Sequence, residues 1–131
     1  MNKKGFTLVE LLAVIAIMSL IMVLVAPTIS NLSKTSNERI RDSKIKAIIA
    51  AGEKYGNDYI NTYRYCDDSY NLELCTVTIG SLIKKGYLEG ENGENIMIDP
   101  VSNCEFTGSV LLCYDPLMIS IDAKYNAGSC N

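Results

Sequence analysis

The stretch "KKGFTLVELLAVIAIM", residues 3–18, decides the fold. Two lysines and a glycine precede an apolar segment, residues 6–26, in which Thr7, Glu10 and Ser19 are the only polar side chains. A helix over this segment would be roughly 30 Å long, enough to cross the hydrocarbon core of a bilayer. The presence of Glu10 in this segment requires an explanation, because placing an ionised carboxylate deep in lipid costs several kcal/mol. The simplest interpretation is a glutamate that faces lipid headgroups.

The residues before the apolar segment do not form an ordinary secretory signal. Such a signal has a small-residue cleavage site after its apolar stretch, whereas this stretch ends at "APTIS" and continues into a helical pattern. Cleavage would therefore precede the apolar segment and leave it on the mature chain. Lys3 and Lys4 favour a cytoplasmic N-terminus and an outside C-terminus, although the five basic residues between positions 34 and 46 weaken that preference.

Pro27 follows the apolar segment and removes one helical hydrogen bond, so the helix could kink there, melt locally or end at Ala26. Apolar and small residues nevertheless recur at helical spacing directly afterwards. This pattern predicts an amphipathic helix over about residues 28–63. Gly52 and Gly56, four positions apart, each weaken a helix by roughly 1 kcal/mol relative to alanine. We interpret them as a point where the helix packs closely against a C-terminal head.

The head holds all five cysteines, and so small a domain gains from covalent links. The stretch "TVTIGSLIKKGYL" predicts a short helix over about 79–85, with Thr76 or Thr78 as its N-cap and Gly86 as its stop. The stretches "IMID" and "LMISID" are expected strands. The stretch "CEFTGSVLLC" is expected to form a hairpin with a two-residue turn at Gly108-Ser109. The predicted fold class is α+β, with a small antiparallel sheet against a helical stem.

The expected hairpin would place Cys104 opposite Cys113 in a pair whose side chains approach closely, so a disulfide is plausible there. Cys66 and Cys75 have the same separation, so a second local disulfide is expected. Cys130 would then be the odd cysteine.

The charges are unevenly distributed along the chain. Residues 27–46 hold five basic and two acidic side chains, whereas residues 47–131 hold five basic and twelve acidic ones. A basic stem could attract the acidic head of a neighbouring subunit, or both could be solvated faces. The few bases without interleaved aromatic residues exclude a nucleic-acid stripe, and no nucleic-acid partner is expected.

The sequence carries no sign of catalytic chemistry. It has no histidine, no nucleophile elbow and no phosphate-binding loop, and its cysteines lack the short spacings of zinc sites. We predict no enzyme activity, no catalytic residue, no cofactor and no metal site. Calcium bound by acids of turn-rich regions is the alternative, and these acids are Asp67, Asp68, Glu89, Glu91, Glu94 and Asp99.

The run Gly5-Phe6-Thr7-Leu8-Val9-Glu10-Leu11-Leu12, behind a short basic leader, resembles the N-terminus of type IV pilins and related pseudopilins. The resemblance extends through Pro27. It implies that a membrane prepilin peptidase cleaves between Gly5 and Phe6 and that Phe6 becomes N-methylated. It also implies that Glu10 pairs with the Phe6 amine of an adjacent subunit in a filament. Pro27 would permit a bend or local unwinding during assembly.

The resemblance also implies the type IV pilin fold and a division of the chain. Residues 1–5 would be the leader, 6–26 the transmembrane and polymerisation helix, 27–63 the amphipathic stem, and 64–131 the disulfide-prone head. The expected partners are identical or homologous pilin subunits, the prepilin peptidase, the membrane, and the inner-membrane assembly platform with its ATPase. The chain would be a single-pass membrane protein with its C-terminus outside before assembly, and part of a cell-surface or extracytoplasmic filament afterwards.

Several alternatives stay open from the sequence. In many pilins a cysteine near the C-terminus closes a terminal loop, which would pair Cys130 with Cys113 or Cys104. The filament could be a surface pilus, a secretion pseudopilus or a DNA-uptake pseudopilus. The second hypothesis is a monomeric, membrane-anchored extracytoplasmic binding module, which would have no use for Glu10.

Overall fold

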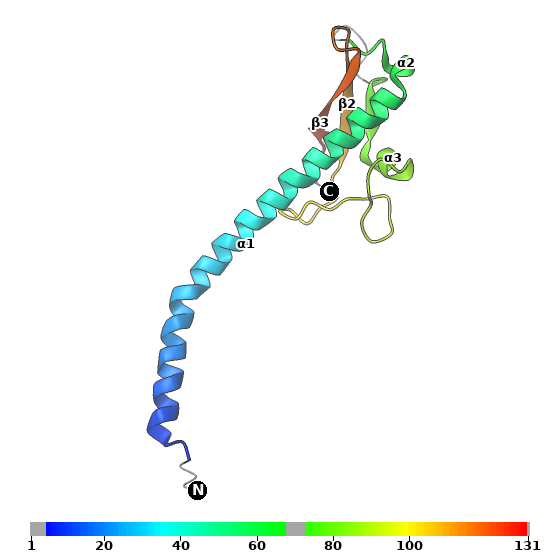
Figure 1. Cartoon of the computed structure of the whole chain (residues 1–131). Helices are drawn as coiled ribbons and strands as arrows, with labels where there is room; N and C mark the ends of the chain where they lie inside the picture. The colour runs from blue at the N-terminus through cyan, green and yellow to red at the C-terminus, as the bar shows by residue number, and fades with distance from the viewer. Residues whose placement is uncertain (1–4, 68–72, 131) are drawn as a thin grey trace. The chain divides into compact units, whose positions relative to one another are not determined.

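The computed structural model describes residues 5–67 and 73–130. Its elements in chain order are α1 (Leu8–Asp58), α2 (Ile60–Tyr63), β1 (Thr76–Thr78), α3 (Ile79–Lys84), β2 (Gly108–Asp115) and β3 (Ser120–Ala127) (Figure 1). The chain forms two compact units, the first ending at Ser36 and the second beginning at Asn37, so α1 contributes to both. One long apolar N-terminal helix and a small antiparallel sheet confirm the predicted α+β class and match the pilin layout.

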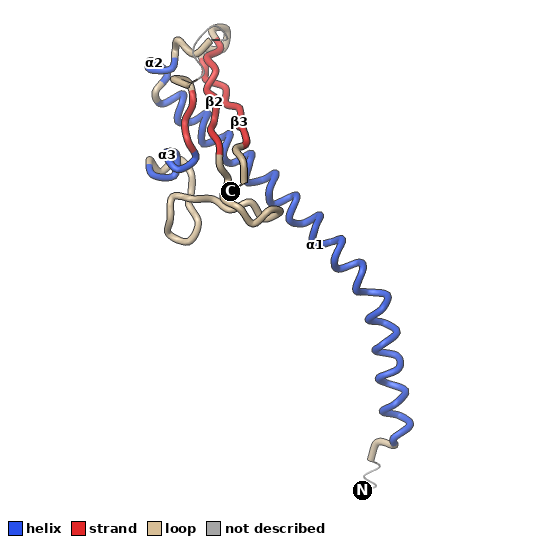
Figure 2. Tube along the Cα trace, turned by 180° about the vertical axis from the view of Figure 1, so that it is seen from behind, coloured by secondary structure: helices blue, strands red, loops and turns tan. Residues whose placement is uncertain are grey.

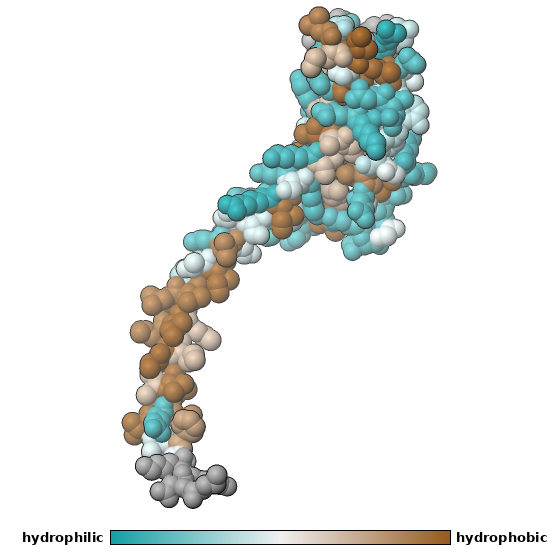
Figure 3. Space-filling model, viewed as in Figure 1, coloured by the Kyte–Doolittle hydropathy of each residue, from teal (hydrophilic) through white to brown (hydrophobic). Residues whose placement is uncertain are grey.

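In the first unit the apolar side chains of α1 are exposed, and hydrophobic surface covers this stretch (Figure 3). Within residues 5–67 and 73–130, α1 is the one helix long and apolar enough to cross a membrane. The Ser19 hydroxyl donates to the carbonyl of Ile15 at 2.7 Å, so this polar group has a partner inside the helix. The helix passes through Pro27, and the alternative of a helix end at Ala26 is wrong.

The expected stem helix over residues 28–63 is divided near its end. Helix α1 ends at Asp58, and the short α2 covers Ile60–Tyr63. Tyr59 between them has a non-helical backbone, with φ −111° and ψ 32°. The predicted end at residue 63 therefore agrees with the end of α2 rather than with that of α1.

The three strands of the second unit form an antiparallel sheet in the order β1-β2-β3 (Figure 2). The predicted hairpin turn at Gly108-Ser109 is wrong, because both residues lie inside β2. Ser109 pairs with Thr78 of β1 and with Asn126 of β3, so partners on both sides hold this segment extended. The chain instead turns after Asp115, and β3 begins at Ser120.

The two other expected strands are shorter than predicted. Of "IMID", Ile98 alone makes a bridge, to Glu105. Of "LMISID", the first three residues lie in the turn between β2 and β3, and Ser120 opens the strand. The predicted short helix is confirmed as α3: the Thr78 hydroxyl accepts from the Ser81 N–H at 3.3 Å, and Gly86 follows the helix with φ +81°.

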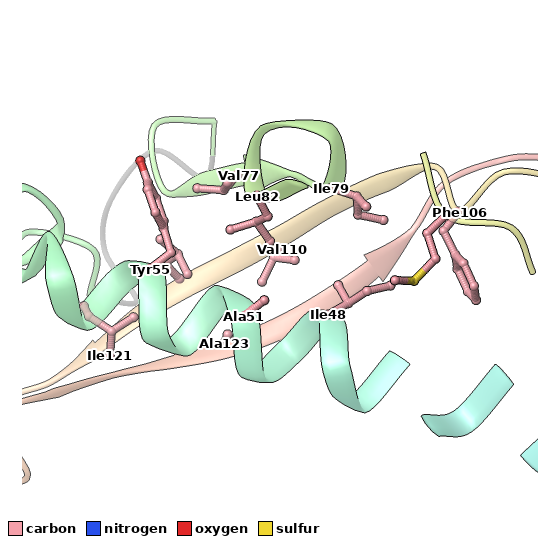
Figure 4. Packing of buried hydrophobic residues seen from close by; sticks show 12 residues of the cluster. Ile48, Ala51, Tyr55, Val77, Ile79, Leu82, Phe106, Val110, Ile121 and Ala123 are labelled. Carbon is pink, nitrogen blue, oxygen red and sulfur yellow. The ribbon is translucent and has the colours of Figure 1, made fainter. Parts of the chain in front are cut away.

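The hydrophobic core of the second unit lies between α1 and the sheet (Figure 4). It includes Ile48, Ala51 and Tyr55 of α1, Ile79 and Leu82 of α3, and Val110, Leu112, Ile121 and Ala123 of the strands. The expected close approach at Gly52 and Gly56 is confirmed. A Cβ on Gly52 would lie 2.6 Å from Val110 Cγ1, and one on Gly56 would lie 2.5 Å from Ile121 Cγ2.

Two disulfides link the second unit. Cys66–Cys75, with a Cα–Cα distance of 5.7 Å, is the local pair favoured from the sequence. Cys104, however, bonds Cys130 at a Cα–Cα distance of 5.8 Å, so the favoured Cys104–Cys113 pair is wrong and Cys113 is the free thiol.

The misplaced hairpin turn explains the wrong pair, because without that turn Cys104 and Cys113 do not face each other. The end of the chain returns instead to the start of β2. The N–H of Gly128 donates to the carbonyl of Thr107 at 2.9 Å, and the Thr107 hydroxyl donates to the carbonyl of Ser129 at 2.7 Å. These bonds bring Cys130 beside Cys104.

Candidate functional site: the exposed N-terminal segment

Two reciprocal hydrogen bonds between Thr7 and Glu10 cap the start of α1. The Thr7 N–H donates to Glu10 Oε2 at 2.9 Å, and the Glu10 N–H donates to Thr7 Oγ1 at 3.3 Å. This is a capping box, in which two backbone donors at a helix start find side-chain acceptors. It was readable in the sequence as "TLVE", but the prediction assigned Glu10 to assembly alone.

The capping box fixes the position of the Glu10 carboxylate. It lies in the first turn of α1, where the helix dipole favours negative charge. One carboxylate oxygen accepts from Thr7, and no described residue donates a hydrogen bond to the other, Oε1. No described residue forms an ion pair with Glu10 either. The charge of Glu10 therefore has no counter-charge within the described part of a single chain.

Gly5 and Phe6 precede the helix. Both are exposed, and the Phe6 side chain is 85% accessible. A Cβ on Gly5 would meet no atom within 4 Å, so nothing crowds this position. The bond between Gly5 and Phe6 thus lies in an accessible non-helical segment, directly before the capped helix.

Two basic residues of α1 bind acids of the loop between α3 and β2. Lys44 Nζ pairs with the carboxylate of Glu91 and donates to the carbonyl of Ile98 at 2.7 Å. The hydrogen bond from Lys44 lowers the pKa of Glu91 below its ordinary value, against the effect of burial. An attraction between the basic stem and the acidic head was expected between subunits. At Arg41 and Lys44, however, the stem binds acids of the head within the same chain.

The second pair joins Arg41 Nε and Asp99 Oδ2 at 3.2 Å. Burial opposes ionisation of Asp99, but hydrogen bonds from the Val101 N–H at 2.9 Å and the Ser102 hydroxyl at 3.0 Å, with the Arg41 charge, outweigh it. The pKa of Asp99 therefore lies below its ordinary value of 3.8. Of the acids considered for calcium, Glu91 and Asp99 thus have basic partners, and Asp68 lies outside the described residues.

Comparison with known proteins identifies the N-terminal segment. Residues 1–26 match the family model of the prokaryotic N-terminal methylation motif. The chain carries the class III signal of type IV pilins and pseudopilins. The methylation motif includes Gly5, Phe6 and Glu10, and it ends just before Pro27. No curated protein and no solved structure matched the chain.

The methylation motif and the fold agree with one another. Helix α1 begins inside the motif, and it supplies the long apolar helix that precedes a small sheet in the pilin fold. Together with the exposed apolar helix, the methylation motif indicates a membrane-anchored protein.

Proposed function

We propose that this chain is a prepilin whose mature form polymerises into a type IV pilus or pseudopilus filament. A membrane prepilin peptidase would cleave it between Gly5 and Phe6, and the Phe6 amine would then be methylated. The match of residues 1–26 to the methylation motif carries this proposal. The accessible, non-helical Gly5–Phe6 bond supports it.

Glu10 provides the physical reason for assembly. Cleavage would create a terminal amine on Phe6, which is largely cationic near neutral pH. A cation from a neighbouring subunit would offset the cost of holding the Glu10 carboxylate in lipid. The capping box supports this role because it fixes the carboxylate at the helix start and leaves Oε1 open to a donor. Assembly would thereby be favoured and its register set.

The parts of the chain then take the following roles. Residues 6–26 would cross the membrane and later form the filament core, with Pro27 allowing the helix to adjust. Residues 27–63 would form the stem, and residues 64–131 the outer head. The N-terminus would face the cytoplasm. Partners would be other pilin subunits, the peptidase, and the inner-membrane assembly platform with its ATPase.

The proposal predicts that Glu10→Gln and Glu10→Ala insert into the membrane normally but are lost from filaments. Glutamine keeps an acceptor for the capping box and removes the charge, whereas alanine removes both. We expect at least a tenfold drop of either variant in filaments sheared from cells, measured by immunoblot against the membrane fraction. Ser19→Ala, which removes another polar group from the same segment, is the matched control and should assemble.

Normal incorporation of both Glu10 variants would contradict assembly through this carboxylate. A wild-type chain that stays in the membrane fraction and never enters filaments would favour a monomeric membrane-anchored module. Processing has its own test. Mass spectrometry of the mature chain should give an N-terminus at methylated Phe6, and an intact Met1 would refute cleavage.

A further inference from the structure

The turn between β2 and β3 exposes three consecutive apolar side chains. Leu117, Met118 and Ile119 are 92%, 76% and 68% accessible. We call these three residues the apolar knob. Figure 3 shows hydrophobic surface at the end of the second unit where the two strands turn. Three neighbouring exposed apolar residues on a tight turn form a contiguous patch, and such a patch marks a contact site more often than scattered apolar residues do.

Hydrogen bonds to Asp115 hold the backbone of the turn that carries the apolar knob. Asp115 Oδ1 accepts from the N–H of Leu117 at 2.8 Å and of Met118 at 3.3 Å, which holds the turn. Ile119 adopts φ +52°, a left-handed conformation that a β-branched residue rarely takes and that asparagine or glycine adopts easily. Ile119 is therefore unfavourable for the isolated unit in two ways: its backbone conformation is strained, and its apolar side chain is exposed to water. Burial of this side chain against a partner would offset that cost.

The same unit carries an apolar groove between α1 and the segment 87–97. It has a volume of about 630 Å³, and we call it the alanine groove. Its lining residues are Ala47, Ala50, Ala51, Lys54, Tyr87, Leu88, Glu89, Gly90, Glu91 and Met97. The small alanine side chains leave room over the helix for bulkier side chains. The groove is thus large enough to accept the side chains of a short apolar turn.

The charges beside the apolar knob and the alanine groove are complementary. Asp115 lies at the base of the knob, and Asp122 is exposed two residues into β3. Lys46 and Lys54 lie one helical turn before and after Ala50, both exposed and without an ion pair among the described residues. The acids at the groove are Glu91, which is neutralised by Lys44, and Glu89.

We propose that the apolar knob of one copy of this chain inserts into the alanine groove of a second copy. The knob and the groove are different surfaces, so the contact is heterologous, and a pair of copies still has one free knob and one free groove. Such a contact does not close into a dimer, and it propagates into an open polymer. This inference rests on the proposed function and names a contact between the head domains of neighbouring subunits in the filament.

Cysteine cross-linking in filaments tests the contact directly. The full chain would carry Met118→Cys and Ala50→Cys in a Cys113→Ser background, which removes the free thiol. Mild oxidation should give a ladder of covalent dimers, trimers and longer products. A variant with only one of the two added cysteines keeps the four disulfide-bonded cysteines and should give no ladder. Filaments without a ladder would overturn this inference while leaving the proposed function intact. A cross-link from position 118 to a different protein would overturn it too, whereas a wild-type chain that never polymerises contradicts the proposed function itself.

A charge swap tests complementarity. Asp122→Lys and Lys54→Glu should each lower the yield of sheared filaments at least threefold, and the double variant should recover most of the loss. Lys84→Glu makes the same charge change at an exposed residue that belongs to neither the apolar knob nor the lining of the alanine groove, and it should have no effect. No recovery in the double variant would contradict pairing of these two surfaces.

The variant Ile119→Asn tests whether Ile119 contributes to the contact between subunits or only to the folding of the head. It suits the left-handed backbone, so the thermal midpoint of the full chain in detergent should be unchanged or higher, while filament yield falls at least threefold. Full filament yield from this variant would count against the knob as a contact.

Discussion

Gly56 of α1 shows how one missing side chain sets the distance between the stem helix and the sheet. An alanine there would gain roughly 1 kcal/mol of helix propensity. Its Cβ, however, would lie 2.5 Å from Cγ2 and 3.0 Å from Cβ of Ile121, a buried strand residue that cannot move without shifting β3. We expect Gly56→Ala to destabilise the head by about 1–3 kcal/mol, measured by urea unfolding of the full chain in detergent.

A double variant checks the cause. Gly56→Ala combined with Ile121→Ala should lose less than the sum of the two single changes, because the second substitution removes the clashing atoms. Ser43→Ala, on an exposed position of the same helix, is the control and should be neutral or slightly stabilising. A Gly56→Ala variant as stable as this control would contradict the close approach.

The predictability of individual residues depends on how far away their partners are. Gly5, Phe6 and Glu10 could be singled out because the motif is local and lies next to an unmistakable apolar segment. The partners of Gly52 and Gly56 lie on β2 and β3, more than fifty residues along the chain, so the sequence could indicate a close approach but not what approaches.

At the scale of elements, the pair Arg41–Asp99 joins α1 to the loop before β2. The lowered pKa of Asp99 means that its charged form stabilises the fold above its ordinary pKa of 3.8, and that this stabilisation is lost as the pH falls through the folded value. Asp99→Asn should therefore cost about 1–3 kcal/mol near neutral pH, where the carboxylate is charged. The difference from the wild-type chain should shrink as the pH falls below 3.8.

Thermal midpoints of both chains near neutral pH and well below the ordinary pKa of Asp99 measure this effect. Asp122→Asn is the control, because Asp122 is exposed and has no ion pair among the described residues. An equal loss for Asp99→Asn at both pH values would show that its contribution does not depend on ionisation.

The elements were predictable where local chemistry determines them. Thr76 or Thr78 as a cap and Gly86 as a stop located α3 from the sequence, because a helix end needs only its own neighbours, and the structure selects Thr78 as the cap. Strand β2 was misread because Gly108-Ser109 has the chemistry of a hairpin turn, yet β1 and β3 pair with it on both sides. Tertiary pairing outweighed the local turn preference there, and the apolar knob could not be anticipated without the true position of the turn. The alanine groove depends instead on how the segment 87–97 packs beside α1, which no local pattern indicates.

At the scale of the whole molecule, the two disulfides stabilise different parts of the head. Cys66–Cys75 closes a separation of nine residues, whereas Cys104–Cys130 spans 26 and fastens the end of the chain beside the start of β2. In a small domain, cross-links stabilise mainly by restricting the unfolded chain, and more so for the longer loop. Cys113, between its two neighbours Leu112 and Tyr114 in the middle strand, takes no part in either link.

The connectivity gives a prediction that separates the two pairings of Cys104. Peptide mapping of the unreduced chain should recover linked peptides containing Cys104 and Cys130, and alkylation before reduction should label Cys113 alone. Replacing Cys104 and Cys130 together with serine should cost about 2–4 kcal/mol of unfolding free energy, because the C-terminal segment would then be held by hydrogen bonds only. Cys113→Ser should change the stability little, since its half-buried thiol cross-links nothing. A linked peptide joining Cys104 to Cys113, or a large loss for Cys113→Ser, would contradict this arrangement, in which Cys113 lies in β2 as a free thiol.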